Sequence, residues 1–336
     1  MQFQIPIHIK PLQPFITYRD KLLLIGSCFT EHIGNHLLDV KFNVLQNPNG
    51  ILFDPLSVCN SLVSYIQNKR YTEDDLFYLN ECWHSWQHHS RFSGIDKKEV
   101  LENINASQQT AHVFLKDADW LIITLGSSFV YKLLLSSSLS ERKGFGSEVA
   151  NCHKAPAQTF NKHLLTIEET VTALDGTLFQ LFHFNPKLKI IFTISPVRHL
   201  RDGVVENNRS KARLIEAVHH LVNKFDNLHY FPAYELVIDV LRDHRFYDID
   251  LAHPNYAATQ FVLEKFSENC FDENTRQLSE EIKKLTIAKN HKAFNPTSNQ
   301  HKQFLQTQLE KAKALQLQLP YLNFSEELKY FSPSNS

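Results

Sequence analysis

A serine near the N-terminus and an aspartate–histidine pair in the second half of the chain have the residue types and spacing that nucleophilic catalysis requires. Ser27 stands in Gly26-Ser27-Cys28-Phe29-Thr30, after a short apolar run and before a helical pattern. Asp250 and His253 are three residues apart, so on a turn the carboxylate can accept a hydrogen bond from Nδ1–H and leave Nε2 free as a base. A serine hydroxyl needs such a base because it is a weak nucleophile at neutral pH.

Each of these residues also has a purely structural explanation. Ser27 at a strand-to-helix turn can simply cap the helix, and an aspartate close to His253-Pro254 is typical of a surface turn. The catalytic interpretation therefore depends on a fold that brings the serine and the pair together.

Five short apolar runs, separated by segments with helical spacing, predict such a fold. Runs of this kind are typical of buried parallel strands, and their alternation with helices predicts a three-layer α/β/α sandwich with a five-stranded parallel sheet, flavodoxin-like, with right-handed crossovers. The strands are expected at residues 22–25, 42–45, 120–125, 189–194 and 228–231, and the helices at 30–38, 55–67, 102–115, 167–184 and 211–225.

The glycines point to one edge of this sheet. The chain has nine, where ordinary usage of roughly 7% would give more than twenty, and it contains no glycine-rich phosphate loop of either common kind. Gly26, Gly50 and Gly126 fall at the carboxyl ends of the first three strands. Because ligands bind at the carboxyl ends of the strands in open α/β sheets, this placement favours a site there.

Charge and cysteine content exclude several classes of partner and location. Thirty-five basic and thirty-six acidic residues give a net charge of -1, so we expect no nucleic acid as principal partner. The longest apolar runs reach about eight residues, too short for a membrane span. Five widely spaced cysteines and the lack of a signal peptide pattern in residues 1–14 predict a cytoplasmic protein.

The last part of the chain has a different amino-acid composition, with charged and glutamine-rich segments. We expect a main domain at residues 15–270 and a helical C-terminal extension at 271–336, with amphipathic helices over 272–290 and 298–315. The extension is predicted to pack on the main domain, with dimerisation as the alternative. A serine-rich stretch at 133–146 is predicted to be a mobile insertion after the third strand.

Taken together, the motifs resemble the GSCFA family, whose name spells the sequence that residues 26–30 match except at Thr30, which stands in place of alanine. Asp250-Leu251-Ala252-His253-Pro254 resembles the terminal block of the SGNH hydrolase (GDSL-like esterase/lipase) superfamily. Further stretches that carry the resemblance are Asn47-Pro48-Asn49-Gly50, Trp83-His84-Ser85, His88-His89-Ser90, Val149-Ala150-Asn151-Cys152-His153-Lys154, Ser195-Pro196-Val197-Arg198-His199 and Arg245-Phe246-Tyr247.

This resemblance implies roles for individual residues. It makes Ser27 the nucleophile, His253 the general base and then acid, and Asp250 the residue that orients the imidazole. It also implies an oxyanion hole formed by the backbone N–H groups of Ser27 and Gly50. The superfamily adds an asparagine side chain after the third strand, where this chain reads Gly126-Ser127-Ser128-Phe129. We expect Ser128 or Asn151 to replace it, because one missing donor costs about 2.7 to 4 kcal/mol of transition-state stabilisation.

Other side chains are candidates for binding the substrate. His84, His88 and His89 are expected to form a wall of the substrate pocket; a zinc site is the alternative, although their spacing does not match a three-ligand zinc enzyme. Arg198 and His199 follow the fourth strand and are expected to bind a substrate anion, or else Arg198 pairs with Asp202 or Asp248. Cys28 is an alternative nucleophile.

The sequence thus favours a serine ester hydrolase that removes an acyl group, such as an O-acetyl group from a carbohydrate, through an acyl-enzyme. The expected partner is a small-molecule or carbohydrate ester, and the expected chemistry needs no cofactor and no metal. Two alternatives stay open at this point: an O-acyltransferase that uses the same Ser27, His253 and Asp250, and a non-catalytic binding module.

Overall fold

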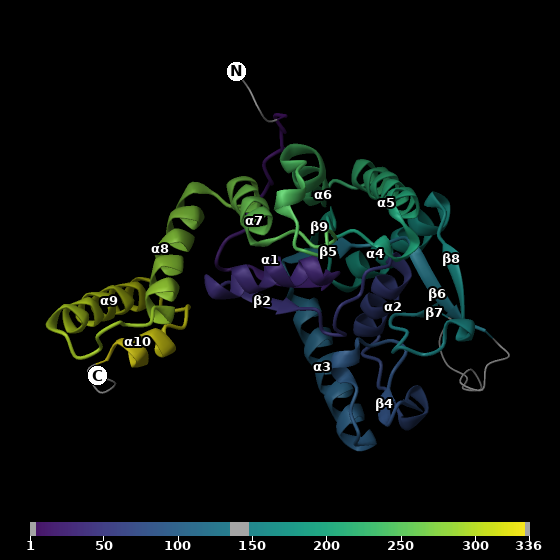
Figure 1. Cartoon of the computed structure of the whole chain (residues 1–336), viewed down its shortest axis with the longest axis horizontal. Coiled ribbons are helices and arrows are strands. Elements are labelled where there is room, and N and C mark those ends of the chain that lie inside the picture. Colours follow the sequence, from purple (N-terminus) through teal and green to yellow (C-terminus); the bar gives the residue numbers. More distant parts are fainter. Residues whose placement is uncertain (1–4, 135–147, 333–336) are drawn as a thin grey trace.

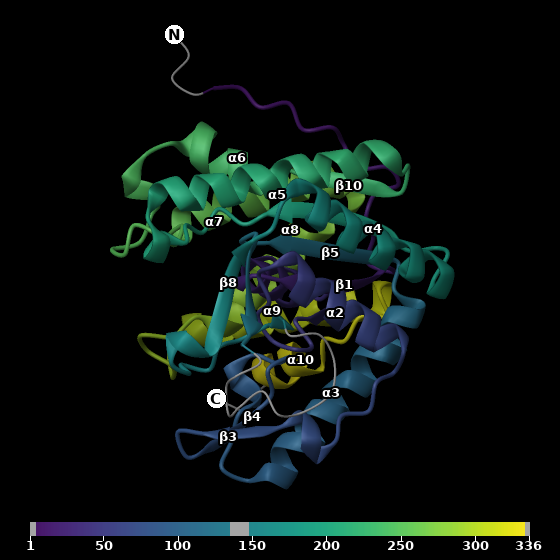
Figure 2. The same cartoon turned by 90° about the vertical axis from the view of Figure 1, so that its right-hand side faces the viewer.

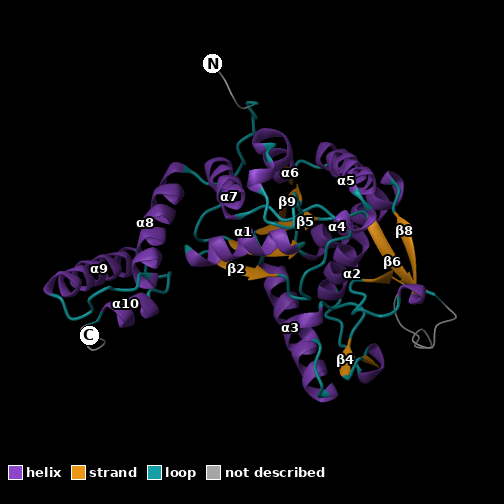
Figure 3. Cartoon of the chain, viewed as in Figure 1, coloured by secondary structure: helices purple, strands orange, loops and turns teal. Residues whose placement is uncertain are grey.

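Helices cover both faces of one five-stranded parallel sheet in the computed structural model, which describes residues 5–134 and 148–332 (Figures 1 and 3). The strand order is β10-β9-β5-β1-β2. Renumbered along the chain, this is the order 2-1-3-4-5 of flavodoxin-like folds, so the predicted fold class is confirmed. The strands are β1 (Lys21–Gly26), β2 (Asn43–Gln46), β5 (Trp120–Leu125), β9 (Lys189–Ile194) and β10 (Leu228–Phe231).

Alternating side chains of the central strands build two separate cores. Leu22 and Leu24 face one core, and Leu23 and Ile25 face the other, as the two-residue period of a strand requires. The first core is completed by α1 (Cys28–Asp39), the short α6 (Ala233–Glu235) and α7 (Tyr256–Cys270). The second is completed by α2 (Pro55–Ile66), α3 (Lys97–Asp117), α4 (Ile167–Phe184) and α5 (Val204–Lys224).

Two helices begin earlier than their apolar patterns predict. Helix α3 begins at Lys97, behind an Asp96 cap, and α5 begins at Val204, rather than at residues 102 and 211. The first turns of α5 carry Asn207, Ser210 and Lys211, which are buried against loops rather than in an apolar core. An apolar stripe therefore marks only the later turns of that helix.

Two small antiparallel sheets lie outside the predicted architecture. A hairpin joins β3 (Phe77–Leu79) to β4 (Cys82–His84), and a three-stranded sheet has the order β7 (Glu148–Val149), β6 (Phe129–Leu133), β8 (Phe160–Leu164). These strands are short and mostly half-exposed, so they carry no buried apolar run. The insertion predicted at 133–146 falls almost wholly on residues 135–147, which lie outside the described residues.

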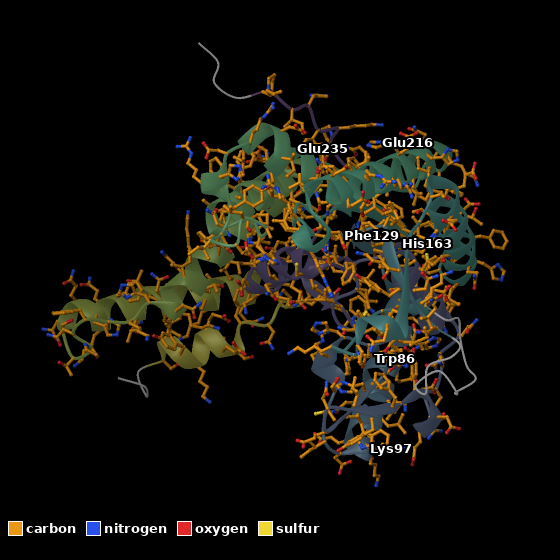
Figure 4. All side chains as sticks on the ribbon, turned by 45° about the vertical axis from the view of Figure 1, so that its right-hand side comes forward. Trp86, Lys97, Phe129, His163, Glu216 and Glu235 are labelled. Carbon is orange, nitrogen blue, oxygen red and sulfur yellow. The ribbon has the colours of Figure 1, made fainter. Side chains whose placement is uncertain are left out.

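Aromatic rings connect the two small sheets. The Trp86 ring stacks on Phe77, with ring centroids 3.6 Å apart, and meets Phe160 edge-on at 5.7 Å. Figure 4 shows Trp86 between Lys97, at the start of α3, and Phe129. Figure 2 shows the hairpin beside α3, at the opposite end of the molecule from α5.

The C-terminal extension consists of α8 (Glu273–Asn290), α9 (Asn299–Gln318) and α10 (Ser325–Phe331), of which α10 was not expected from the sequence. Figure 1 shows α8 leading away from the sheet to α9 and α10. Thr286 Oγ1 donates a hydrogen bond to the Asp39 carbonyl, at the last residue of α1. The extension therefore packs near the amino end of β2, at the edge opposite to Ser27.

No helix in the described part of the chain combines the length and apolar composition that a bilayer span requires.

A buried carboxylate holds α10 in place. Glu327 is 1% exposed, and its oxygens lie 2.9 Å from Lys41 Nζ and 3.2 Å from Lys289 Nζ. Lys41 Nζ also lies 5.2 Å from the centre of the Phe324 ring. Three segments of the chain therefore meet at one charge.

We predict that Glu327→Gln destabilises the protein by about 1 to 3 kcal/mol, less than the loss for a fully buried pair because both amines reach water. The measurement is urea unfolding followed by circular dichroism. Glu326→Gln is the matched control, because Glu326 also contacts Lys289 but its side chain is 82% exposed; we expect a change below about 0.5 kcal/mol there. Equal effects of the two substitutions would contradict this role of Glu327.

Candidate active site

Ser27 lies at the point where the strand order of the sheet reverses. It directly follows β1, which has β2 on one side and β5 on the other, and open α/β sheets bind ligands at such a point. Ser27 is 3% exposed and caps α1, because its Oγ accepts a hydrogen bond from the Phe29 N–H at 3.3 Å. The structural explanation of Ser27 is thus correct, and the hydroxyl proton stays free to be donated.

Gly26 allows the two central strands to come together beside this serine. Its φ is +144°, and a Cβ at this position would collide with the Thr124 carbonyl of β5. A larger residue would strain the backbone and separate the strands. The glycine of the motif is therefore explained by packing at the sheet edge.

The segment after β2 connects the loops that follow β1 and β5. Asn47 Oδ1 accepts the Gly26 N–H at 2.9 Å, and the Phe53 carbonyl accepts the N–H groups of Gly126 and Ser127 at 2.7 and 3.0 Å. These bonds hold Phe53 close to Ser27. Both residues border Gly126, because a Cβ at Gly126 would lie 2.9 Å from Phe53 Cβ and 3.4 Å from Ser27 Cβ.

A buried lysine joins the ends of β5 and β9. Lys211 Nζ donates hydrogen bonds of 2.6 Å to the carbonyls of Gly126 and Ser195. The residue is only 1% exposed. Burial lowers its pKa to about 7. Sequence reasoning missed this residue, although Lys211 shares a helical face with the buried Leu214 and Val218, and a lysine on an apolar face is a usable signal.

Asp250 and His253 form the predicted pair. His253 Nδ1 lies 2.6 Å from Asp250 Oδ2, and Oδ1 of the same carboxylate accepts the N–H groups of Ala252 and His253 at 2.9 and 3.0 Å. These backbone hydrogen bonds, with that from the imidazole, lower the Asp250 pKa to about 2. Leu251 has a φ of +56°, so the turn is a constrained one. No hydrogen bond engages His253 Nε2 within residues 5–134 and 148–332.

The structure brings His253 to the edge that holds Ser27 without joining the two side chains. Burial lowers the pKa values of His199 and His32, and the charge of His253 lowers both further, so its imidazole lies near α1 and the loop after β9. Within the described residues, no hydrogen bond links Ser27 Oγ to His253. Catalytic hydrogen bonds are commonly long until substrate binds.

The expected oxyanion donors are mostly engaged elsewhere. The Ser27 N–H donates to the Thr124 carbonyl at 3.0 Å, and the Gly50 N–H closes a turn on the Asn47 carbonyl at 2.7 Å. Ser128 Oγ is fully buried and donates to the Ser210 carbonyl at 3.0 Å. Only Asn151 keeps an amide group, Nδ2, without a hydrogen bond in the described structure, while its Oδ1 accepts the His153 N–H.

The three histidines expected in a pocket wall have different environments. His84 is 8% exposed and both ring nitrogens are bonded, to Ser93 Oγ and the Leu79 carbonyl. His88 is 1% exposed, and burial lowers its pKa to about 3. His84 and His88 therefore pack the hairpin region. Only His89 reaches the sheet edge, where its Cβ covers Gly50. Among the described residues, no group of three or more His, Cys, Asp or Glu side chains could hold a metal ion.

Arg198 and His199, the residues expected to bind a substrate anion, lie in different surroundings. The Arg198 guanidinium lies over the Tyr247 ring, 4.1 Å from its centre, and the Arg198 N–H donates to the Ala252 carbonyl. Arg198 therefore supports the turn that carries His253, and no ion pair with Asp202 or Asp248 occurs in the described part of the chain. Burial lowers the His199 pKa to about 4, so this imidazole is neutral at physiological pH.

Comparison with known proteins gives a family and several distant structural similarities. Among solved structures, the chain is similar to a carbohydrate esterase family 3 protein from Talaromyces cellulolyticus, with 9% identity, coverage of 78% of this chain and 99% of that chain, and a TM-score of 0.37. It is also similar to an acetyl xylan esterase from the rumen bacterium Butyrivibrio proteoclasticus, with 12% identity, coverage of 76% and 64%, and a TM-score of 0.34.

No curated protein matches the sequence. The model described as the C-terminal domain of GSCFA domain proteins matches residues 282–333. The model of the GSCFA family matches residues 21–266, which include Ser27, Asp250 and His253. Because this match spans well over half of the sequence, the chain belongs to the GSCFA family.

Proposed function

We propose that the protein is a serine ester hydrolase in which Ser27 is the nucleophile and His253, oriented by Asp250, is the base. The observation that carries the proposal is the 2.6 Å contact between His253 Nδ1 and Asp250 Oδ2, at the edge where Ser27 caps a helix, with Nε2 making no hydrogen bond to the described residues. This arrangement fixes the tautomer that a general base needs.

The reaction follows from these groups. Ser27 Oγ attacks the ester carbonyl carbon, its proton moves to His253 Nε2, and the carbonyl electron pair moves onto oxygen. The C–O bond of the alcohol then breaks, and the leaving oxygen takes the proton from His253. Water repeats the sequence on the acyl-enzyme and releases the acid. The positive end of the α1 dipole stabilises the charge that develops beside Ser27.

The proposed substrate carries a small acyl group, such as an O-acetyl group on a carbohydrate. Ser27, Phe53 and His199 lie within 3.4 Å of the position that a Cβ at Gly126 would occupy, so we place the acyl group beside these three residues. An alcohol in place of water would make the same acyl-enzyme an acyl donor. The cytoplasmic location stays a prediction, which the five unpaired cysteines support.

The competing nucleophile, Cys28, is weaker here. Burial raises the pKa of its thiol, although Lys211 opposes the shift. The reactive species of cysteine is the thiolate, so this environment favours the serine.

We predict that Ser27→Ala abolishes hydrolysis of p-nitrophenyl acetate and labelling by a fluorophosphonate, since no hydroxyl remains to attack. Because Ser27 also caps α1, the substitution is expected to cost about 1 kcal/mol of stability. Ser27→Gly is the matched variant, since glycine keeps most of the capping preference, and it should be equally inactive. Cys28→Ala should retain activity. Hydrolysis by Ser27→Ala at the parent rate would rule out the serine.

A second prediction concerns Asp250. Asp250→Asn should lower kcat by about 10²- to 10⁴-fold, because the imidazole loses its orienting carboxylate. The Asp250 pKa of about 2 keeps this carboxylate ionised throughout a practical assay.

The matched control is Asp248→Asn on the same turn, whose side chain makes no hydrogen bond among the described residues. It should keep both the rate and the pH profile. The role assigned to Asp250 would be wrong if Asp250→Asn behaved like this control.

A further inference from the structure

The loop after β5 lacks the asparagine that the resemblance to the SGNH hydrolase superfamily predicts, but the side chain of His199 lies close to this loop. His199, which follows β9, places Nε2 3.3 Å from the position that a Cβ at Gly126 would occupy. Ser27 Cβ lies 3.4 Å from that position. The imidazole and the serine therefore both border the position above Gly126.

His199 is held firmly in this orientation. Its backbone N–H donates to Asn207 Oδ1 at 2.9 Å, and its ring packs on Phe53 with centroids 5.5 Å apart. Both supports belong to segments that also hold the loop beside the serine. The Phe53 carbonyl accepts the Gly126 N–H. Helix α5 carries Asn207 and also Lys211, which donates to the Gly126 carbonyl. The ring is thus preorganised rather than free to follow a substrate.

The ring nitrogens of His199 have no hydrogen-bond partner in the part of the chain that the structure describes, although the side chain is largely enclosed. Nε2 is therefore available to a group that arrives with the substrate.

We propose that His199 donates a hydrogen bond from Nε2–H to the oxyanion formed when Ser27 attacks the ester, replacing the missing asparagine amide. This inference rests on the proposed function of Ser27. In the attack, the Ser27 proton goes to His253 and the carbonyl electron pair goes to oxygen, which accepts the bond from His199. No proton leaves His199 in either step.

The surroundings of the two histidines separate their roles. Burial and the nearby charges of Lys211, His253 and Lys162 lower the His199 pKa to about 4, and Asp202 opposes the shift only in part. His199 is a poor base at neutral pH, but its neutral ring still has one N–H to donate. His253 instead has a carboxylate at Nδ1. Neighbouring groups with opposite environments commonly divide the donor and base roles in this way.

The test compares two variants of the full chain with p-nitrophenyl acetate as the substrate. His199→Phe keeps a ring against Phe53 but has no N–H, and it should lower kcat by about 10²- to 10³-fold with little change in KM. His199→Gln places an amide N–H near the position of Nε2 and should recover about tenfold or more of that loss. The acid limb of the pH profile should stay where it is in His199→Gln, because His253 remains the base.

Three results would overturn the role of His199: parent activity in His199→Phe, equal losses in both variants, or a displaced acid limb in His199→Gln. Circular dichroism checks the fold of each variant, and His199→Leu repeats the test if the phenylalanine variant does not fold. A parent enzyme that does not depend on Ser27 would instead refute the proposed function. The two failures are thus told apart by the Ser27→Ala control.

Discussion

The edge of the sheet around Ser27 depends on the buried amine of Lys211. The carbonyls of Gly126 and Ser195 end two adjacent central strands, and without a donor both would be buried and unpaired, at about 1 to 3 kcal/mol each. Lys211 Nζ satisfies both at 2.6 Å. Its burial lowers the pKa to about 7, and an amine that has lost its proton still has the two N–H groups that these carbonyls need. The interaction therefore fixes where both loops leave the sheet.

Other residues of helix α5 also hold the neighbouring loops in position. One residue before Lys211, Ser210 Oγ accepts the Ser128 N–H at 2.8 Å, and one turn earlier Asn207 holds the His199 backbone. Three polar residues on the first turns of one helix thus place the loops after β5 and β9. This is why the helix begins before its apolar stripe, and why Ser128 is turned away from the space beside Ser27.

The sequence predicted the parts of the fold that burial determines. The strands at 120–125, 189–194 and 228–231 and the helix at 167–184 coincide residue for residue with β5, β9, β10 and α4, because continuous apolar runs are decided by the core alone. The Asp250–His253 contact was also predictable, because a three-residue spacing on a turn leaves few other arrangements.

The environment of each side chain around the site was less predictable from residue type. His84 and His89 are five residues apart, yet one is bonded on both nitrogens inside the hairpin and the other covers Gly50. The N–H of Gly50 was expected to face a substrate, but the turn that makes a glycine favourable there also uses that N–H. Residue type does not report such competition, because it depends on the hydrogen bonds that each loop makes in the folded chain.

In the proposed reaction, the same competition explains why the oxyanion donor comes from a side chain. The backbone N–H groups at these strand ends already have acceptors: Ser27 donates to Thr124 and Gly126 donates to Phe53, each in a neighbouring segment, and Gly50 donates to Asn47 within its own turn. The His199 imidazole, which packs on Phe53, can reach the space above Gly126 without breaking any of these bonds. A neutral ring suits this position, since a charged one would add a second cation close to the Lys211 amine. In the proposed mechanism, burial thus decides which of two histidines at one edge is the base and which can only donate.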